Sequence, residues 1–320
     1  MGSSVVEAED SRLEIGTTGN VDGDIDATNS PLIMGILNIT SDSFSDGDKY
    51  YCTEDAVKHA MDMINNGADI IDIGAESTRP GAKPVDSATE ISKLLPVLKE
   101  LKSLMNEHDS TTPCPLCSST ETSPLPSPKG EGVSRKLISI DTYKSQTAKA
   151  VLDIGIDIIN DIYALQYDKE MVHVLRDYPQ TKVVLVHKVG TPENMQDNPQ
   201  YEDIIFEITD FFKERIDFCL ANGISANRLI IDPGIGFGKT FEHNIEILKS
   251  LDEFKALGIP ILLGASRKSF INQIYPSKPQ DRLVGSLATT VVAFMKNIDI
   301  IRVHDVKEHN EMIKSLSWMV

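Results

Sequence analysis

The stretch GADIIDIGAESTRPGA (residues 67–82) places a short apolar run between a glycine and a polar segment that contains proline. Its centre, DIIDIGA (69–75), is rich in β-branched residues and too short for an amphipathic helix, which predicts a β-strand. A nearly continuous apolar run is typical of a strand buried on both faces, as in a parallel sheet covered by helices. The polar residues 76–81 would then form the loop at the carboxyl end of this strand.

The same pattern, a short apolar run followed by a longer stretch with helical spacing, occurs eight times along the chain. The other seven predicted strands are LIMGILNIT (32–40), KLISIDTY (136–143), IDIINDI (156–162), KVVLVHK (182–188), RLIIDPGI (228–235), PILLGAS (260–266) and IDIIRVH (298–304). The predicted helices cover residues 53–67, 88–105, 145–155, 169–179, 201–223, 241–258, 281–297 and 306–320. Four of these stretches end at a glycine (Gly67, Gly155, Gly223 and Gly258), where a helix is expected to stop.

Eight strand–helix units within residues 31–320 predict a single (β/α)8 TIM barrel, which is an α/β fold. The alternative is a doubly wound open sheet, whose nucleotide-binding form carries G-x-G-x-x-G after an early strand. The glycine-rich GIGFGK (234–239) follows the sixth strand and lacks that spacing. The barrel is therefore the favoured fold.

Two segments lie outside this pattern. Residues 1–30 carry seven acidic residues and one arginine and lack aromatic residues, which predicts a disordered acidic tail. Residues 107–135, between the second helix and the third strand, are rich in Ser, Thr and Pro and predict a flexible insertion at the amino-terminal face of the barrel. Cys114 and Cys117 in this insertion form one C-x-x-C pair with no second pair nearby, which is a weak signal for zinc.

The composition excludes several classes of protein. A net charge of -17 argues against nucleic acid as a partner, because phosphate binding needs a basic surface. No run of 18 apolar residues indicates a membrane span, and the first residues do not resemble a secretory signal. Four scattered cysteines do not suggest a disulfide framework. We therefore expect a cytoplasmic protein.

Polar side chains follow the predicted strands at their carboxyl ends, where barrel enzymes build their active sites. They are Asn38, residues 76–81, Asp141, Asn160 and Asp161, His187, Asp232, residues 266–269, and Arg302 with His304. Each one alone has a structural explanation: Asp141 as a helix cap, Asp232 as a turn residue, His187 as a core histidine. Together they predict one site for a polar, partly anionic small molecule at the mouth of the barrel.

The residue types narrow the chemistry of this site. Buried carboxylates and amides (Asp141, Asn160 and Asp232) suit a flat heterocycle whose edge offers N–H donors. The basic side chains Arg79, Arg267, Lys268, Arg302 and His304 suit a phosphate or a carboxylate. No serine or cysteine stands in a recognisable nucleophile motif. Catalysis by positioning and charge stabilisation is therefore favoured over covalent catalysis.

Seven blocks of the chain resemble the dihydropteroate synthase family. They are GILNITSDSFSDG, GADIIDIGAESTRPGA, ISIDTYK, IINDI, DPGIGFGK, GASRKSF and RVHDV, in this order from residue 35 to residue 306. The resemblance implies a pterin-binding TIM barrel of folate biosynthesis. Its reaction joins 6-hydroxymethyl-7,8-dihydropterin diphosphate to p-aminobenzoate, through a pterin cation, and releases pyrophosphate.

The resemblance also implies roles for individual residues. The implied catalytic residues are Asp141, Lys268, Asp46 and Arg79, and the pterin contacts are Asp141, Asn160, Asp232, Lys268, Gly264 and Val186. Asn38, Arg302, His304 and Thr78 would bind the diphosphate, with Mg2+ bridging its oxygens to Asn38. Thr78, Arg79, Pro80, Phe237, Lys268 and Ser269 would form the p-aminobenzoate pocket, where sulfonamides are expected to compete. A homodimer, and a link to a pterin pyrophosphokinase by fusion, are further expectations from the family.

The chain departs from the family pattern in two loops near the site. The fifth strand continues into His187-Lys188-Val189-Gly190, with Val186 where methionine is common. The first loop has Ser41 in place of a proline and Asp48 in place of a second glycine, which changes the backbone freedom of a loop expected to close with Phe44 as its apolar anchor. Two alternatives stay open: a methyltetrahydrofolate-type methyltransferase barrel and a non-catalytic pterin-binding module.

Overall fold

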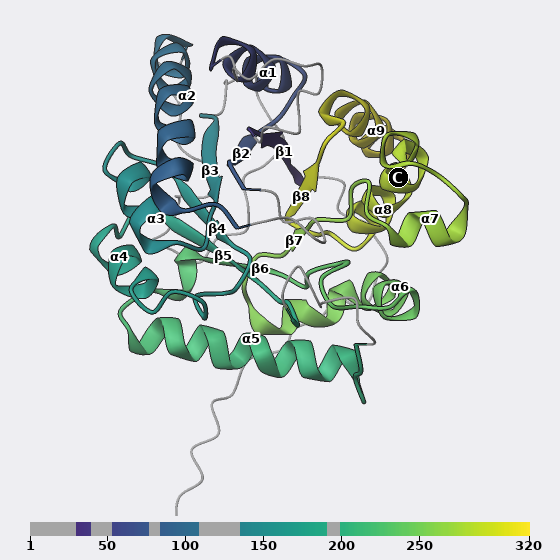
Figure 1. The fold of residues 1–320 in the computed structure, drawn as a ribbon. Helices are drawn as coiled ribbons and strands as arrows, with labels where there is room; N and C mark the ends of the chain where they lie inside the picture. Colours follow the sequence, from purple (N-terminus) through teal and green to yellow (C-terminus); the bar gives the residue numbers. More distant parts are fainter. Residues whose placement is uncertain (1–29, 40–52, 77–83, 109–134, 191–198) are drawn as a thin grey trace, which may run out of the picture.

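The computed structural model describes residues 30–39, 53–76, 84–108, 135–190 and 199–320 (Figure 1). Within them, eight parallel strands form one sheet in the order β6-β5-β4-β3-β2-β1-β8-β7. A bridge between Ile231 and Ile261 joins the two edge strands and closes the sheet into a barrel. The predicted TIM barrel is confirmed; the acidic tail and most of the predicted insertion lie outside the described residues.

All eight predicted strands are present. Their bounds are β1 Leu32–Asn38, β2 Ile70–Gly74, β3 Leu137–Asp141, β4 Ile158–Asp161, β5 Lys182–Val186, β6 Leu229–Asp232, β7 Leu262–Leu263 and β8 Ile300–Val303. The glycines predicted to end helices adopt positive φ angles, as Gly67 (φ 105°) and Gly258 (φ 67°) illustrate.

Helices surround the strands on the outside of the barrel (Figure 1). Their bounds are α1 Thr53–Asn65, α2 Ser87–His108, α3 Ser145–Leu152, α4 Met171–Asp177, α5 Ile204–Ala221, α6 Phe241–Lys249, α7 Phe270–Ile274, α8 Leu283–Met295 and α9 Val306–Met319. Three short 3-10 helices cover Ala226–Arg228, Leu251–Leu257 and Pro279–Asp281. Among the described residues, no helix is long and apolar enough to cross a membrane.

Three helical segments differ from the prediction. The single helix predicted over 241–258 is α6 followed by a 3-10 helix, because Ser250 leaves the helical region (φ -111°, ψ 19°). α2 continues to His108 and so includes the first residues of the predicted insertion 107–135, since no glycine or proline stands between Met105 and His108. The short helix α7 was not predicted, because five residues are too few to show a helical period.

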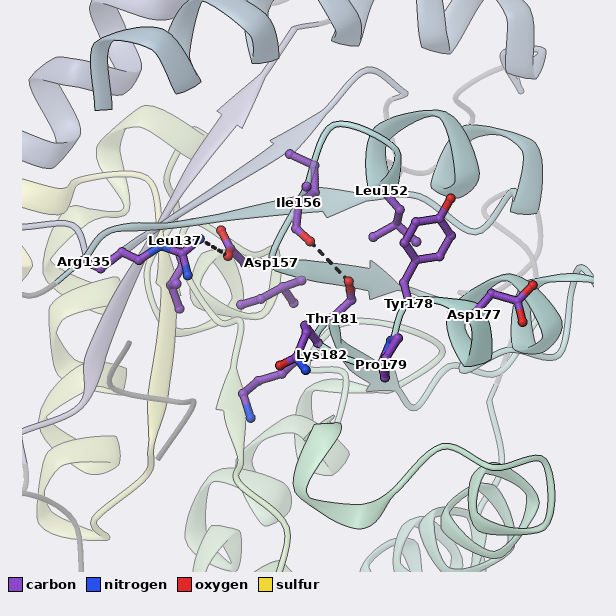
Figure 2. Close-up of a pocket in the computed structure, with 13 residues that line it drawn as sticks. Arg135, Leu137, Leu152, Ile156, Asp157, Asp177, Tyr178, Pro179, Thr181 and Lys182 are labelled. Carbon is purple, nitrogen blue, oxygen red and sulfur yellow. Dashed lines mark hydrogen bonds and ion pairs between the residues drawn. The ribbon is translucent and has the colours of Figure 1, made fainter. Parts of the chain in front are cut away.

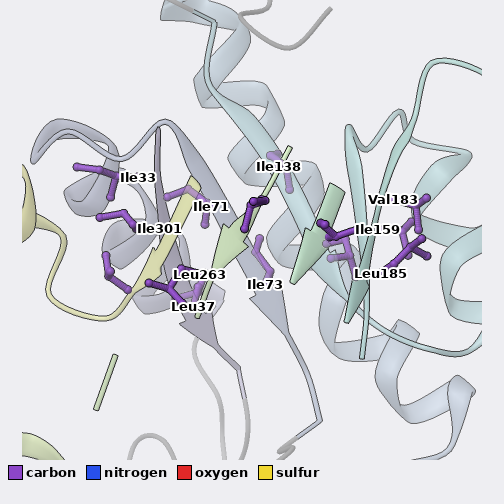
Figure 3. Close-up of a cluster of buried hydrophobic side chains, with 14 of the residues drawn as sticks. Ile33, Leu37, Ile71, Ile73, Ile138, Ile159, Val183, Leu185, Leu263 and Ile301 are labelled. Atoms are coloured by element: carbon purple, nitrogen blue, oxygen red, sulfur yellow. The ribbon is translucent and has the colours of Figure 1, made fainter. Parts of the chain in front are cut away.

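The apolar core has two parts. The larger part lies between the strands and the helices and includes Ile33, Ile71, Ile138, Ile159 and Val183 (Figure 3). The smaller part fills the bottom of the barrel interior with Met34, Ile70, Leu137, Ile158, Val184, Ile230, Leu262 and Ile300, one from each strand. Because side chains alternate along a strand, the next inward positions lie two residues further along, toward the carboxyl ends. Those positions determine the site.

Candidate active site

Above the apolar floor, the inward positions of the even-numbered strands β2, β4, β6 and β8 are polar. They hold Asp72, Asn160, Asp232 and Arg302. Of these four residues, Asp72, Asn160 and Asp232 are at most 5% exposed. We call this interior layer, with Asp141 and Lys268 above it, the lumen site. A buried polar layer of this kind is costly for folding unless its members bond one another or a ligand.

Arg302 connects three strands across the lumen. Its Nε donates to Asp72 Oδ2 at 2.6 Å, and its terminal NH2 group donates to Asp141 Oδ2 at 3.1 Å. Asn160 Nδ2 donates to the same Asp72 oxygen at 3.1 Å. One fully buried carboxylate thus fixes both the guanidinium and the amide, so Asp72 orients two residues that the sequence assigned to the site.

Asp72 itself was missed by the sequence analysis. It lies in the middle of the apolar run DIIDIGA, whereas the predicted site residues stand at the ends of strands. The signal that could have found it is the alternation of the strand: Ile70 faces the interior, and Asp72 is two residues further along on the same face.

Asp232 and Lys268 form the second half of the lumen site. Asp232 Oδ1 accepts from Gly234 N at 2.7 Å, and its Oδ2 faces Gly264, where an added Cβ would lie 3.3 Å from that oxygen. Lys268 Nζ donates to the carbonyl oxygen of Ile235 and lies 4.3 Å from the centre of the Phe237 ring. Because Gly264 has no side chain, it places no Cβ against this oxygen of Asp232.

Burial shifts the titration of these groups. It raises the pKa of Asp141 to about 7, although Arg302 opposes the shift, and it raises the pKa of Asp232 against the attraction of Lys268. It lowers the pKa of Lys268 to about 8, which Asp232 partly offsets. Acids and bases whose pKa values move toward neutrality within one cavity are typical of catalytic sites.

Several buried acceptors in the lumen have no hydrogen-bond partner among the described residues. They are Asp72 Oδ1, Asn160 Oδ1 and Ser139 Oγ. An unsatisfied buried polar group costs about 1–3 kcal/mol. A ligand whose edge carries N–H groups would satisfy such acceptors, as expected for a heterocycle.

The rim of the barrel carries the remaining predicted residues. Asn38 ends β1 and is half-buried, Val186 ends β5 and is buried, and Ser269 is exposed just before α7. His304 follows β8, with its Nδ1 3.1 Å from Ser266 Oγ. Arg267 is different: its guanidinium forms an ion pair with Asp305, with Nε 3.0 Å from Oδ2, so this predicted basic residue is already neutralised.

His187, just after β5, is a core residue, which is the structural explanation that the sequence offered for it. His187 is 4% exposed, and its Nδ1 lies 2.9 Å from Nζ of the buried Lys239. Burial and the neighbouring Lys239 lower the pKa of His187 well below its usual value. The pair packs behind the lumen against Phe211, so it supports the loop after β6.

Asp46, Thr78, Arg79 and Pro80 lie outside the described residues, as do Ser41, Phe44 and Asp48. In the part of the chain that is described, no three His, Cys, Asp or Glu side chains come together as a metal-binding group.

A cavity of about 440 Å³ lies at the opposite end of the barrel (Figure 2). Its lining includes Arg135 and Asp157, whose side chains form an ion pair at 2.7 Å. Asp157 also accepts from Ile138 N at 3.0 Å, and Thr181 Oγ1 donates to Ile156 O at 3.3 Å. These contacts hold the amino-terminal ends of β3, β4 and β5 together, the end of a barrel that serves stability.

Comparison with known proteins gives one consistent family. The family model described as pterin binding enzyme matches residues 34–110 and 129–304. A dihydropteroate synthase of Clostridium beijerinckii is 40% identical over 289 residues, which cover 90% of this chain and 94% of that protein.

Two solved structures show the same likeness in three dimensions. The Yersinia pestis dihydropteroate synthase, solved as a complex with a sulfonamide drug, has a TM-score of 0.77 and 36% identity over 91% of this chain and 94% of that one. The Clostridium difficile dihydropteroate synthase, solved in the presence of pteroic acid, has a TM-score of 0.76 and 40% identity over 92% and 99%.

Proposed function

The chain belongs to the dihydropteroate synthase family of pterin-binding enzymes, and from this membership together with the lumen site we infer its reaction. It condenses 6-hydroxymethyl-7,8-dihydropterin diphosphate with p-aminobenzoate, giving 7,8-dihydropteroate and pyrophosphate in folate biosynthesis. The observation that carries this conclusion is the buried layer of Asp72, Asn160, Asp232 and Arg302, with Lys268 beside it. It combines acceptors for a heterocycle with cations for anionic groups.

We propose that the pterin lies on this layer. Asp232 Oδ2 faces Gly264, which has no side chain to cover it, and Asn160 Oδ1 lacks a partner among the described residues, so both can accept from N–H groups of the ring. Val186, at the end of β5, would pack against the pterin ring, and the ammonium of Lys268 would donate a hydrogen bond to the pterin. A dry, preorganised pocket makes each of these bonds strong.

The chemical step is the breaking of the C–O bond between the pterin methylene and the diphosphate. The bonding electrons leave with the diphosphate, which makes the methylene carbon positive. We propose that ionised Asp141 stabilises this charge, because a carboxylate in a low-dielectric interior acts more strongly than one in water. The amine of p-aminobenzoate then attacks the carbon and loses a proton. Arg302 favours the ionised form of Asp141, against the effect of burial on its pKa.

The anionic leaving group needs cations and a metal at the mouth. We propose Arg302, His304, Asn38 and Thr78 for the diphosphate, and Asn38 for Mg2+. A single amide oxygen suits an ion that keeps several waters and binds mainly through phosphate oxygens. When bound, Mg2+ would neutralise charge on the departing diphosphate.

We propose that p-aminobenzoate enters beside Phe237. The ring of Phe237 is half-buried and lies next to the Lys268 ammonium, and Ser269 is exposed nearby in the chain. Thr78, Arg79 and Pro80 of the second loop complete this proposed pocket. Asp46 and Arg79 are proposed to assist catalysis. Sulfonamides, which resemble the aryl amine, are proposed to compete here.

A pyrophosphate-release assay tests the function. With both substrates and Mg2+ present, the protein should release pyrophosphate and form 7,8-dihydropteroate, and omission of either substrate should abolish release. A non-catalytic pterin-binding module would bind the pterin without release. Absence of release above background, with Mg2+ present, would contradict the proposed function.

We further propose a homodimer in the cytoplasm, as the family resemblance implies. The apolar side chains of Ile274 on α7 and Val284 on α8 are 57% and 72% exposed, which favours an interface on this side of the barrel. Sedimentation velocity should give twice the chain mass of 35.3 kDa. Fusion to a pyrophosphokinase remains a prediction from the family.

A further inference from the structure

Lys188 lies at the mouth of the barrel, two residues after the end of β5. Val184 and Val186, which precede it at alternate positions, both belong to the apolar cluster inside the barrel. The alternation of side chains therefore directs Lys188 to the interior as well. It stands one layer above the pterin position proposed for Val186.

The ammonium of Lys188 is buried but has no hydrogen-bond partner among the described residues. Its Nζ lies 3.9 Å from the centre of the Tyr163 ring and 5.8 Å from that of the Phe237 ring. The other cations of the interior are bonded: Arg302 to two carboxylates, Lys268 to a carbonyl oxygen, Lys239 to His187 and Phe237. Lys188 thus differs from these cations, because its ammonium lies against aromatic rings and has no hydrogen-bond acceptor among the described residues.

Aromatic ring faces attract an ammonium, but they do not replace hydrogen bonds to its three N–H groups. The nearest acidic groups that attract Lys188 are Asp141, Asp161 and Glu76, and none of them forms an ion pair with it. Burial lowers the pKa of Lys188 to about 8, so it still carries its charge at neutral pH. A charged ammonium that has no hydrogen-bond partner among the described residues can receive an anion.

We propose that Lys188 binds the carboxylate of the p-aminobenzoate substrate and so helps to select aryl amines that carry this anion. This inference rests on the proposed function. The diphosphate is the other anion of the reaction. Of its proposed residues, Asn38 ends β1, Arg302 lies in β8, His304 follows β8, and Thr78 follows β2 in the sequence. In the strand order, β5 is separated from β1 by three strands, whereas Phe237 follows the neighbouring β6.

Both lysines at the aromatic side of the mouth contact the same ring. Lys268 Nζ is 4.3 Å and Lys188 Nζ is 5.8 Å from the centre of Phe237. An aryl amine against this ring would therefore meet Lys268 and Lys188 together. Lys268 already donates to Ile235 and is proposed to donate to the pterin. None of the three N–H groups of Lys188 has an acceptor among the described residues, so Lys188 has more donors to offer a carboxylate.

The test compares Lys188→Met with the wild type in steady-state turnover. The matched control is Lys182→Met, which removes the same charge from the first residue of β5, at the opposite end of the barrel. Two amines are used in parallel: p-aminobenzoate, and the uncharged p-aminobenzamide of nearly the same shape. Thermal unfolding of each variant verifies that it is folded, and Lys188→Arg keeps the positive charge.

Lys188→Met should raise the KM for p-aminobenzoate by about tenfold or more, the effect of one charge-assisted hydrogen bond. The KM for p-aminobenzamide and the KM for the pterin diphosphate should stay within about twofold, and Lys188→Arg should restore most of the preference for the carboxylate. An unchanged ratio between the two amines would overturn the proposal. So would a selective rise in the KM for the pterin diphosphate, which would assign Lys188 to that anion. Absence of turnover in the wild type would instead refute the proposed function.

Discussion

Asp72 is the residue on which the geometry of the lumen depends. Its Oδ2 accepts from Arg302 at 2.6 Å and from Asn160 at 3.1 Å, while the carboxylate is fully buried. A buried carboxylate of this kind adds little to the free energy of unfolding, because burial of its charge is costly. Its main effect is to fix the positions of its partners. The sequence predicted both partners from the rule that polar residues at strand ends meet at one mouth. It did not predict Asp72, because its position within the strand makes it look like part of an apolar run.

Lys268 should be essential for turnover and dispensable for folding. Its ammonium lies at the pterin position proposed above, and burial already makes its charged form costly, as the lowered pKa of about 8 indicates. Lys268→Ala should lower kcat by roughly a hundredfold or more, the usual effect of removing one buried charged donor. Far-ultraviolet circular dichroism should match the wild type. Unchanged turnover would remove Lys268 from the site.

The ionised form of Asp141, which is proposed to act in catalysis, should lower the free energy of unfolding of the protein. Burial raises its pKa to about 7, above the ordinary value near 3.8, so the native state binds this proton more tightly than the unfolded chain does. The stability from the protonated form is complete at low pH and is lost as the pH rises toward 7. Asp141→Asn cannot titrate, so at pH 8 it should unfold at a higher temperature than the wild type while losing turnover.

The pH series supplies the control for this prediction. The difference in melting temperature between Asp141→Asn and the wild type should shrink steadily from pH 7 to pH 5, because over that range the native carboxyl binds a proton while the carboxyl of the unfolded chain stays ionised. A difference that stays constant, or that grows as the pH falls, would show that Asp141 is not held in a desolvated position.

At the scale of elements, the turn after β6 is the most constrained connection at the mouth. Gly234 adopts a φ of 70°, and an added Cβ would lie 1.9 Å from the carbonyl oxygen of His187. That oxygen belongs to the backbone of the neighbouring chain segment after β5, so it cannot move aside without disturbing the pairing of β5 with β6. The turn therefore fixes Asp232 on one side and His187 on the other.

Gly234→Ala should destabilise the protein by about 3 kcal/mol or more, because a clash with backbone adds to the unfavourable φ. Gly258→Ala is the matched control: Gly258 has nearly the same φ, 67°, but an added Cβ would meet nothing within 4 Å. It should cost only about 1–2 kcal/mol for the left-handed backbone. Urea unfolding of both variants measures the difference, and equal losses would mean that the contact with His187 is not rigid.

The sequence predicted the elements whose apolar residues recur with a clear period, and it missed the elements that lack such a period. Strand β1 and its end at Asn38 follow directly from an apolar run that stops at an amide. The division of residues 241–258 at Ser250 depends on the backbone conformation of that one residue, which the spacing of apolar residues does not predict. β7 has two residues, although the run PILLGAS (260–266) suggested a full strand. These two residues pair with β8, and the bridge of the preceding Ile261 to Ile231 closes the barrel.

For the whole molecule, the barrel separates stability from function along its axis. The floor of apolar side chains and the ion pair of Arg135 with Asp157 hold the amino-terminal end, whereas the carboxyl-terminal end keeps unsatisfied acceptors and shifted pKa values. The sequence could predict this division, because eight repeated units allow few folds. It could not supply the distances within the lumen, which depend on strand register.

Calorimetric titration of the pterin diphosphate tests the central claim, that the buried layer of the lumen is the pterin site. The wild type should bind with a measurable heat, and Asp232→Ala should lose binding, because Asp232 offers the buried carboxylate oxygen that faces Gly264. Asp177→Ala, an exposed carboxylate on α4, should bind like the wild type. Normal affinity in a folded Asp232→Ala protein would contradict the account.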